Sequence, residues 1–168
     1  MIKDTGERRE FDTGAVRDIA DGKGRCDLLP LDVVEKIMLS PVYDGKSDLV
    51  IRDISLFIKE GDEGILARSL YMFMGTRNWD FYTMLLEVSK RFEEGAKKYG
   101  EYNWQKGIPL HCYIDSAVRH YLKWCRGDTD EPHDKAFVWN ILCALWTLEH
   151  KPELDDIRHE SKKGETEK

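Results

Sequence analysis

An almost unbroken apolar stretch from Ala136 to Trp146 limits most strongly how this chain can fold. The stretch AFVWNILCALW suits a helix over Glu131–His150, with Asp130 as its N-cap and Pro132 in its first turn. A helix that is apolar on nearly all sides is buried, so we expect it at the centre of the fold. Asn140 interrupts the stretch, and a buried amide needs hydrogen-bond partners.

Two amphipathic helices are predicted before this central helix, over Phe81–Gly95 and about His111–Cys125. Farther upstream, a short helix is expected from Leu31 to before Pro41. A helical pair over Asp48–Lys59 and Glu63–Met74 is typical of an insertion at 36–80. The chain is therefore predicted to be all-α. We expect a loose arm over 1–13, a single domain over 14–150 and a charged tail over 151–168.

Composition narrows the classes of partner. The chain has 168 residues, with 26 basic and 32 acidic side chains, and this excess of acid disfavours nucleic-acid binding. No apolar run approaches the roughly 20 residues of a membrane-spanning helix, and no signal sequence is recognisable. The four cysteines, Cys26, Cys112, Cys125 and Cys143, contain no CxxC pair, which favours reduced thiols and a cytoplasmic location.

Two pairs of acidic residues are candidate ligands for a divalent cation. Glu87 and Glu94 are seven residues apart, so they project from nearly the same side of a helix. Glu131 and Asp134 are three apart and adjacent on one helical face. The alternatives are ordinary: a solvated stripe paired with neighbouring lysines, and a first helical turn whose acids interact with the helix dipole.

Basic and aromatic side chains alternate in the segment 96–110, where ammonium groups suit phosphates and flat rings suit a base. The same aromatic residues could instead attach the segment to the core. A Gly-rich basic turn is a second candidate phosphate contact. Asp115 with Arg119 is also readable as an intrahelical pair, and His120 as a packed residue. The candidate nucleotide-binding residues are Arg17, Lys23, Arg25, Lys98, Asn103, Trp104, Lys106, Arg119, His120 and Asn140.

Three ordered motifs, RDIADGKGRCDLLP, GAKKYGEYNWQKGIP and DSAVRHYLKWCRGDTDEPHDKAFVWN, resemble the dATP/dGTP diphosphohydrolase family of phages. The resemblance covers about residues 14–35 and 87–150, and that family is similar to MazG-like all-α nucleotide pyrophosphohydrolases. It implies a helical bundle that forms a homo-oligomer, a dimer or a tetramer. It also implies that Mg²⁺ or Mn²⁺, held by Glu and Asp of facing helices, helps to split a purine nucleoside triphosphate into monophosphate and pyrophosphate.

MazG-like enzymes place an ExxE pair on one helix and an ExxD pair on another. Here Glu131 and Asp134 match the second pair. The first pair is altered, because the residue three positions after Glu87 is Lys90 and the residue three positions after Glu94 is Lys97, where the motif has Glu. The catalytic residues that the resemblance implies are Glu87, Glu94, Glu131 and Asp134. All four are also candidate metal ligands, with Asp115 as a replacement.

Two alternatives remain. The dipeptide His133-Asp134, with His120 upstream and Asp155 or Asp156 downstream, could form the metal set of an HD-type phosphohydrolase, which would release triphosphate or phosphate. The other alternative is a non-catalytic nucleotide-binding or interaction protein of a phage or mobile element.

Overall fold

The structure, a computed structural model, describes residues 7–18, 48–75 and 81–160. It is mostly helical, so the predicted all-α class is confirmed. The described residues belong to two compact units: unit 1 contains 7–18 and 81–156, and unit 2 contains 48–75 and 157–160. The expected boundaries, a single domain over 14–150 with a tail over 151–168, stay a prediction.

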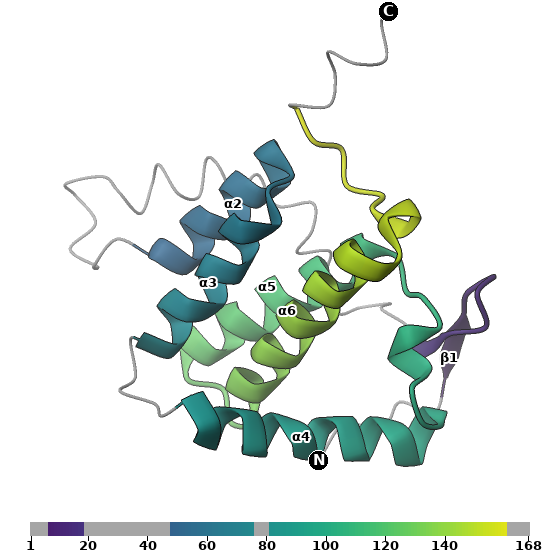
Figure 1. The fold of residues 1–168 in the computed structure, drawn as a ribbon. Helices are drawn as coiled ribbons and strands as arrows, with labels where there is room; N and C mark the ends of the chain where they lie inside the picture. Colours follow the sequence, from purple (N-terminus) through teal and green to yellow (C-terminus); the bar gives the residue numbers. More distant parts are fainter. Residues whose placement is uncertain (1–6, 19–47, 76–80, 161–168) are drawn as a thin grey trace, which may run out of the picture. The chain divides into compact units, whose positions relative to one another are not determined.

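Unit 1 is built on three helices, α4 (Phe81–Tyr99), α5 (Leu110–Arg126) and α6 (His133–His150). Helix α6 packs along α5 and also contacts α4 (Figure 1). Its side chains Phe137, Ile141 and Ala144 are fully buried. The apolar sequence of α6 therefore has the central position that its composition predicts, since both neighbours are needed to cover it.

Two predicted helix ends were wrong. Helix α4 does not end at Gly95 but continues to Tyr99, because a glycine can be accommodated inside a helix, and the chain turns at Gly100, whose φ is 92°. Helix α6 begins at His133 after Pro132, and Asp130 does not act as its N-cap. Its carboxylate accepts a hydrogen bond from the His133 ring instead, at 2.8 Å.

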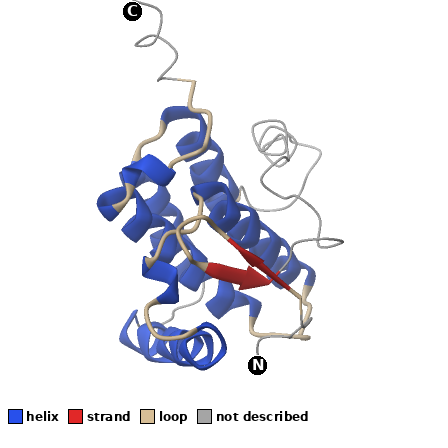
Figure 2. Ribbon diagram, turned by 90° about the vertical axis from the view of Figure 1, so that its right-hand side faces the viewer, coloured by secondary structure: helices blue, strands red, loops and turns tan. Residues whose placement is uncertain are grey.

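A β-hairpin begins within the segment 1–13, which was expected to be a loose arm, and ends at Asp18. Strand β1 (Arg8–Glu10) pairs antiparallel with β2 (Val16–Asp18), as Figure 2 shows. The Asn103 side chain, in the short helix η2 (Asn103–Gln105), accepts from Val16 N at 3.0 Å and donates to Val16 O at 2.9 Å. These two bonds satisfy backbone groups of β2 and fix the hairpin to the helices of unit 1.

Unit 2 contains the helical pair that the sequence predicts, α2 (Leu49–Glu60) and α3 (Glu63–Gly75). The Asp48 side chain caps α2, and the fully buried Asp53 accepts hydrogen bonds from Arg68 on α3 at 2.8 and 2.9 Å. His159, within the expected charged tail, is buried and bonds Ile58 O at 3.0 Å. Within the expected tail, the structure also contains the short helix η3 (Pro152–Leu154), which belongs to unit 1.

Several expectations lie outside the described residues. They are the helix after Leu31, the basic turn with Lys23 and Arg25, and Cys26. Within 7–18, 48–75 and 81–160, the structure contains no helix that is both long enough and apolar enough to cross a membrane.

Gly107 offers a test of the packing in unit 1. Its φ is 118°, and an added Cβ would lie 2.7 Å from Leu154 Cδ1 and 3.2 Å from Thr13 Cγ2. We expect Gly107→Ala to lower the free energy of unfolding by about 1–3 kcal/mol, the usual cost of a strained backbone conformation. Chemical denaturation measures this change.

Gly95→Ala is the matched control, because Gly95 lies inside α4 with open space around its Cα. We expect this change to stabilise the protein by roughly 0.5–1 kcal/mol. Equal effects of the two substitutions would contradict the proposed packing of Gly107.

Candidate functional site

A nearly buried ion pair connects α4 to the residues that precede α6. Arg91 Nη2 lies 3.2 Å from Glu131 Oε2 and also donates to the carbonyl of Pro132 at 3.2 Å. The Arg91 and Glu131 side chains are only 8% and 14% exposed. Because Arg91 lies between Glu87 and Glu94 in the sequence of α4, this contact directs that face of α4 toward the start of α6.

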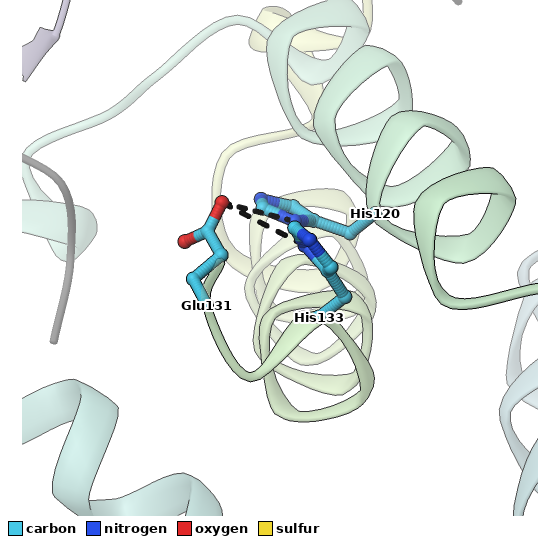
Figure 3. Close-up of side chains that lie close together, drawn as sticks. All are labelled: His120, Glu131 and His133. Atoms are coloured by element: carbon cyan, nitrogen blue, oxygen red, sulfur yellow. Dashed lines mark hydrogen bonds and ion pairs between the residues drawn. The ribbon is translucent and has the colours of Figure 1, made fainter. Parts of the chain in front are cut away.

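Two histidines lie beside the other oxygen of Glu131. Figure 3 shows His120, on α5, and His133, the first residue of α6, with their rings close to the Glu131 carboxylate. The two Nδ1 atoms are 2.9 Å apart, and Glu131 Oε1 is 3.6 Å from that of His120 and 3.7 Å from that of His133. On its other side, His133 Nε2 contacts Asp130 at 2.8 Å.

The electrostatics of this group favour a neutral His120. Burial, together with the positive charge of Arg91 and further neighbours, lowers the pKa of His120 to about 2. The hydrogen bond from His133 is the main cause that lowers the pKa of Asp130 to about 2. At neutral pH the His120 imidazole is therefore uncharged and Asp130 is ionised, which are the protonation states in which these side chains bind metal ions.

Arg17 reaches the same region from strand β2. Its Nη2 donates to Ser116 Oγ at 2.7 Å and to Asn140 Oδ1 at 2.8 Å, and its guanidinium lies 5.3 Å from the centre of the Tyr113 ring. The Arg17 Nη1 atom is buried and has no hydrogen-bond partner among the described residues. The positive charge of Arg17 is thus held by neutral partners, with one buried donor unpaired among the described residues.

The contacts of Asn140 explain why the apolar stretch of α6 contains one polar residue. Its Nδ2 donates to Ala136 O at 2.8 Å, one turn earlier in α6, while its Oδ1 accepts from Arg17. The residue thus holds Arg17 from within the core.

The predicted acidic ligands are only partly brought together. Glu87 pairs with Lys90, whose hydrogen bond lowers the pKa of Glu87, and Asp134 is close enough to oppose that shift. Asp134 contacts the Lys135 ammonium at 3.2 Å. Asp115 forms the expected intrahelical ion pair with Arg119, and Glu94 is half-buried on α4.

The part of the chain that the structure describes contains two groups of possible metal ligands. Within each group, all ligand atoms lie within 4.8 Å of one another. One contains His120, Glu131 and His133, and the other contains Asp128, Asp130 and His133. Neither includes Glu87, Glu94, Asp115 or Asp134. The residues of the HD-type alternative do not form one of these groups either, because Asp134 is outside both and Asp156 contacts His111, nine residues before His120 on α5.

Most of the candidate nucleotide-binding side chains of the segment 96–110 contact other residues of unit 1. Trp104 packs edge-on against Phe92 and Trp146, at ring distances of 5.4 and 5.0 Å. Lys98 lies on α4 and forms an ion pair with Asp18 of β2 at 2.8 Å. Asn103 is engaged by Val16, as described above, whereas Lys106 is exposed.

Arg91 and His133 are the residues of this region that the sequence analysis did not assign to the main site. Arg91 follows Met84 and Val88 at helical spacing, so the sequence places it on the buried side of α4. A charged residue on a buried stripe needs a partner, and that signal could have identified it. His133 was considered only as part of the HD alternative.

Comparison with known proteins gives one match. Residues 72–157 match the family model described as "dATP/dGTP diphosphohydrolase, N-terminal". This range includes α4, α5 and α6 completely, together with Arg91, His120, Glu131 and His133. No curated protein and no solved structure matches the chain.

The packing of Trp104 leads to a prediction. Trp104→Ala should lower the free energy of unfolding, by less than the roughly 3–5 kcal/mol of a fully buried tryptophan, because Trp104 is half-buried. Its effect on the KM for nucleotide should be small. Thermal denaturation and steady-state kinetics measure the two quantities.

Tyr102→Ala serves as the control, since Tyr102 is an exposed aromatic residue two positions away. It should change neither quantity. A large rise in KM for Trp104→Ala with unchanged stability would instead support stacking on a base.

Proposed function

We propose a function on the premise that this chain belongs to the dATP/dGTP diphosphohydrolase family, since the family match spans just over half of its residues. The proposed reaction is the hydrolysis of purine (deoxy)nucleoside triphosphates to monophosphate and pyrophosphate. The family match is the observation on which the reaction depends. The contacts among α4, α5 and α6 support the assignment of residues to it.

The reaction is proposed to depend on Mg²⁺ or Mn²⁺. Carboxylates are the ligands that these ions prefer, and Asp134 on α6 is close enough to Glu87 on α4 to act on the pKa of Glu87. Glu131 and Glu94 complete the proposed set, with Asp115 as the replacement. To bind the ion, Glu87 has to break its half-exposed ion pair with Lys90.

Each group has a role in the proposed reaction. The bound ion would supply positive charge at the phosphate oxygens and make a water molecule easier to deprotonate. A carboxylate of the acidic set accepts the proton of the attacking water. A new bond forms between the water oxygen and the α-phosphorus, the bond between that phosphorus and the bridging oxygen breaks, and pyrophosphate leaves.

Arginines would bind the triphosphate. Arg17 is the best supported, because its guanidinium is held by neutral Ser116 and Asn140 and has a buried donor to offer. Arg119 on α5 and Arg17 are both close enough to His120 for their charges to lower its pKa. Asn140 would then position Arg17 rather than contact the base. Lys106, Lys23 and Arg25 remain candidate phosphate contacts.

A homo-oligomer, which the resemblance implies, also remains a proposal. Tyr82, Leu85 and Leu86 are exposed at helical spacing on α4 and form an apolar surface that a second copy could cover. Light scattering on the purified chain would decide its oligomeric state.

We expect Glu131→Gln and Asp134→Asn each to abolish hydrolysis. The far-UV circular dichroism of Asp134→Asn should stay unchanged, whereas Glu131→Gln also removes the charge that faces Arg91 and is assayed at a temperature at which its circular dichroism shows it folded. The loss of activity should exceed the roughly 10–100-fold that follows removal of an outer-shell partner of a metal. The assay is a panel of ribo- and deoxyribonucleoside triphosphates with Mg²⁺ or Mn²⁺, with products separated by ion-exchange chromatography.

Glu93→Gln is the matched control, because Glu93 is an exposed acid of α4 that pairs only with Lys97 among the contacts described. Full turnover in both test variants would refute the acidic set. Triphosphate as the product would support the HD-type alternative. Thermal stabilisation by nucleotide without any turnover would support a non-catalytic binding protein.

Arg17→Met should raise the KM for the triphosphate, because the loss of a charge-assisted hydrogen bond to a phosphate costs about 1.5–3 kcal/mol, or roughly 10–100-fold. Arg9→Met is its control, since Arg9 is exposed and lies opposite Arg17 in the hairpin. Steady-state kinetics on folded variants measure the effect. Equal KM values for the two variants would rule out the proposed phosphate contact.

A further inference from the structure

We propose that His120, Glu131 and His133 form a binding site for a divalent first-row transition-metal ion such as Zn²⁺ or Co²⁺. This site shares Glu131 with the proposed magnesium set and differs from it in its two imidazole ligands. This inference goes beyond the proposed hydrolysis and does not require it. The site would exist in a protein that binds nucleotide without turnover.

The distances among the three ligand atoms fit one ion. The same three atoms, the two Nδ1 atoms and Glu131 Oε1, are separated by 2.9, 3.6 and 3.7 Å. The point equidistant from the corners of such a triangle lies about 2 Å from each, which is the length of Zn–N and Zn–O bonds. The spacing of these three atoms therefore matches that around a single ion.

The other polar atoms of two ligands already have partners. His133 Nε2 contacts Asp130 at 2.8 Å, and when Nε2 donates this hydrogen bond, Nδ1 keeps a lone pair for the ion. Glu131 Oε2 accepts from Arg91 at 3.2 Å, which leaves Oε1 facing the imidazoles. Carboxylate–histidine and arginine–carboxylate contacts of this kind orient ligands and fix the histidine tautomer.

His120 needs only a tautomer change. In the contact between the two rings, His120 Nδ1 is the donor if His133 donates to Asp130. When the ion binds, the Nδ1 proton of His120 moves to Nε2 through solvent, and both imidazoles then offer a lone pair. No net proton has to leave the ring.

The surrounding charges do not exclude a cation. Arg17, Arg91 and Arg119 are near His120, and they would oppose a bare ion. Three carboxylates in the same region offset them: Glu131 beside Arg91, Asp115 beside Arg119, and Asp130 behind His133. Two of the three arginines are therefore already paired with carboxylates, which reduces the repulsion that the ion would meet.

The ligand types select the class of ion. Imidazole nitrogens suit Zn²⁺, Co²⁺ and Fe²⁺ better than Mg²⁺, and two histidines with one carboxylate leave coordination positions open for water or a phosphate oxygen. The second group, Asp128, Asp130 and His133, is less suitable, because Arg126 pairs with Asp128 and Lys123 with Asp130 at half-exposed positions.

The test is a Co²⁺ titration of the full chain after removal of metals with a chelator, followed by visible absorption. Excess Mg²⁺ is present throughout, so that the other carboxylates of the magnesium set do not take up Co²⁺, while the imidazoles favour Co²⁺ over Mg²⁺ at the site with the two histidines. We expect one equivalent of Co²⁺ to bind to the wild type, with the spectrum of a site containing nitrogen ligands. Zn²⁺ should displace it.

Variants locate the ion. His120→Gln and His133→Gln should abolish binding, and Asp130→Ala should weaken it by roughly 10–100-fold through the orientation of His133. His150→Gln is the matched control, because His150 is exposed at the far end of α6, and it should bind Co²⁺ like the wild type.

The outcomes separate the two proposals. The metal site is wrong if the wild type binds no Co²⁺, or if His150→Gln loses as much affinity as the other histidine variants. If His133→Gln does not fold, Asp130→Ala, which changes a half-exposed side chain, decides instead. Co²⁺ binding without release of pyrophosphate from any nucleotide would support this site and refute the hydrolysis.

Discussion

The ion pair between Arg91 and Glu131 is the interaction on which the candidate site depends. It joins the middle of α4 to the segment that leads into α6, and both side chains are nearly buried. Removing one member of a buried ion pair typically costs about 3–5 kcal/mol, because the remaining charge is left without compensation. The pair therefore fixes which face of α4 meets the start of α6, and it fixes which oxygen of Glu131 faces the two histidines.

The hairpin provides the second constraint. Asn103 bonds both backbone groups of Val16, and the next residue, Arg17, extends to Ser116 on α5 and Asn140 on α6. A segment from the start of the chain thus adds a positive charge to a region that is otherwise built from α4, α5 and α6. Since Arg17 has only neutral hydrogen-bond partners among the described residues, this charge is available for an anionic group.

Much of the fold could be predicted from the sequence, because helices depend on local spacing. The helical pair in unit 2, the amphipathic α4 and α5 and the apolar α6 all follow from residues three and four apart. The errors were at the ends of elements and in short segments. Gly95 suggested an end that α4 passes through, and the strands of the hairpin are too short to give a periodic signal.

The sequence by itself determined the helical class, the central helix and the family resemblance, and it identified Glu131, Arg17, His120 and Asn140 as candidates. Only the tertiary structure decided which of these residues meet. It placed Glu131 with Arg91 and two histidines, Asn140 with Arg17, and Trp104 with other aromatic rings. Spacing along one helix fixes neighbours on that helix, whereas contacts between helices depend on how their buried faces pack, which no local pattern specifies.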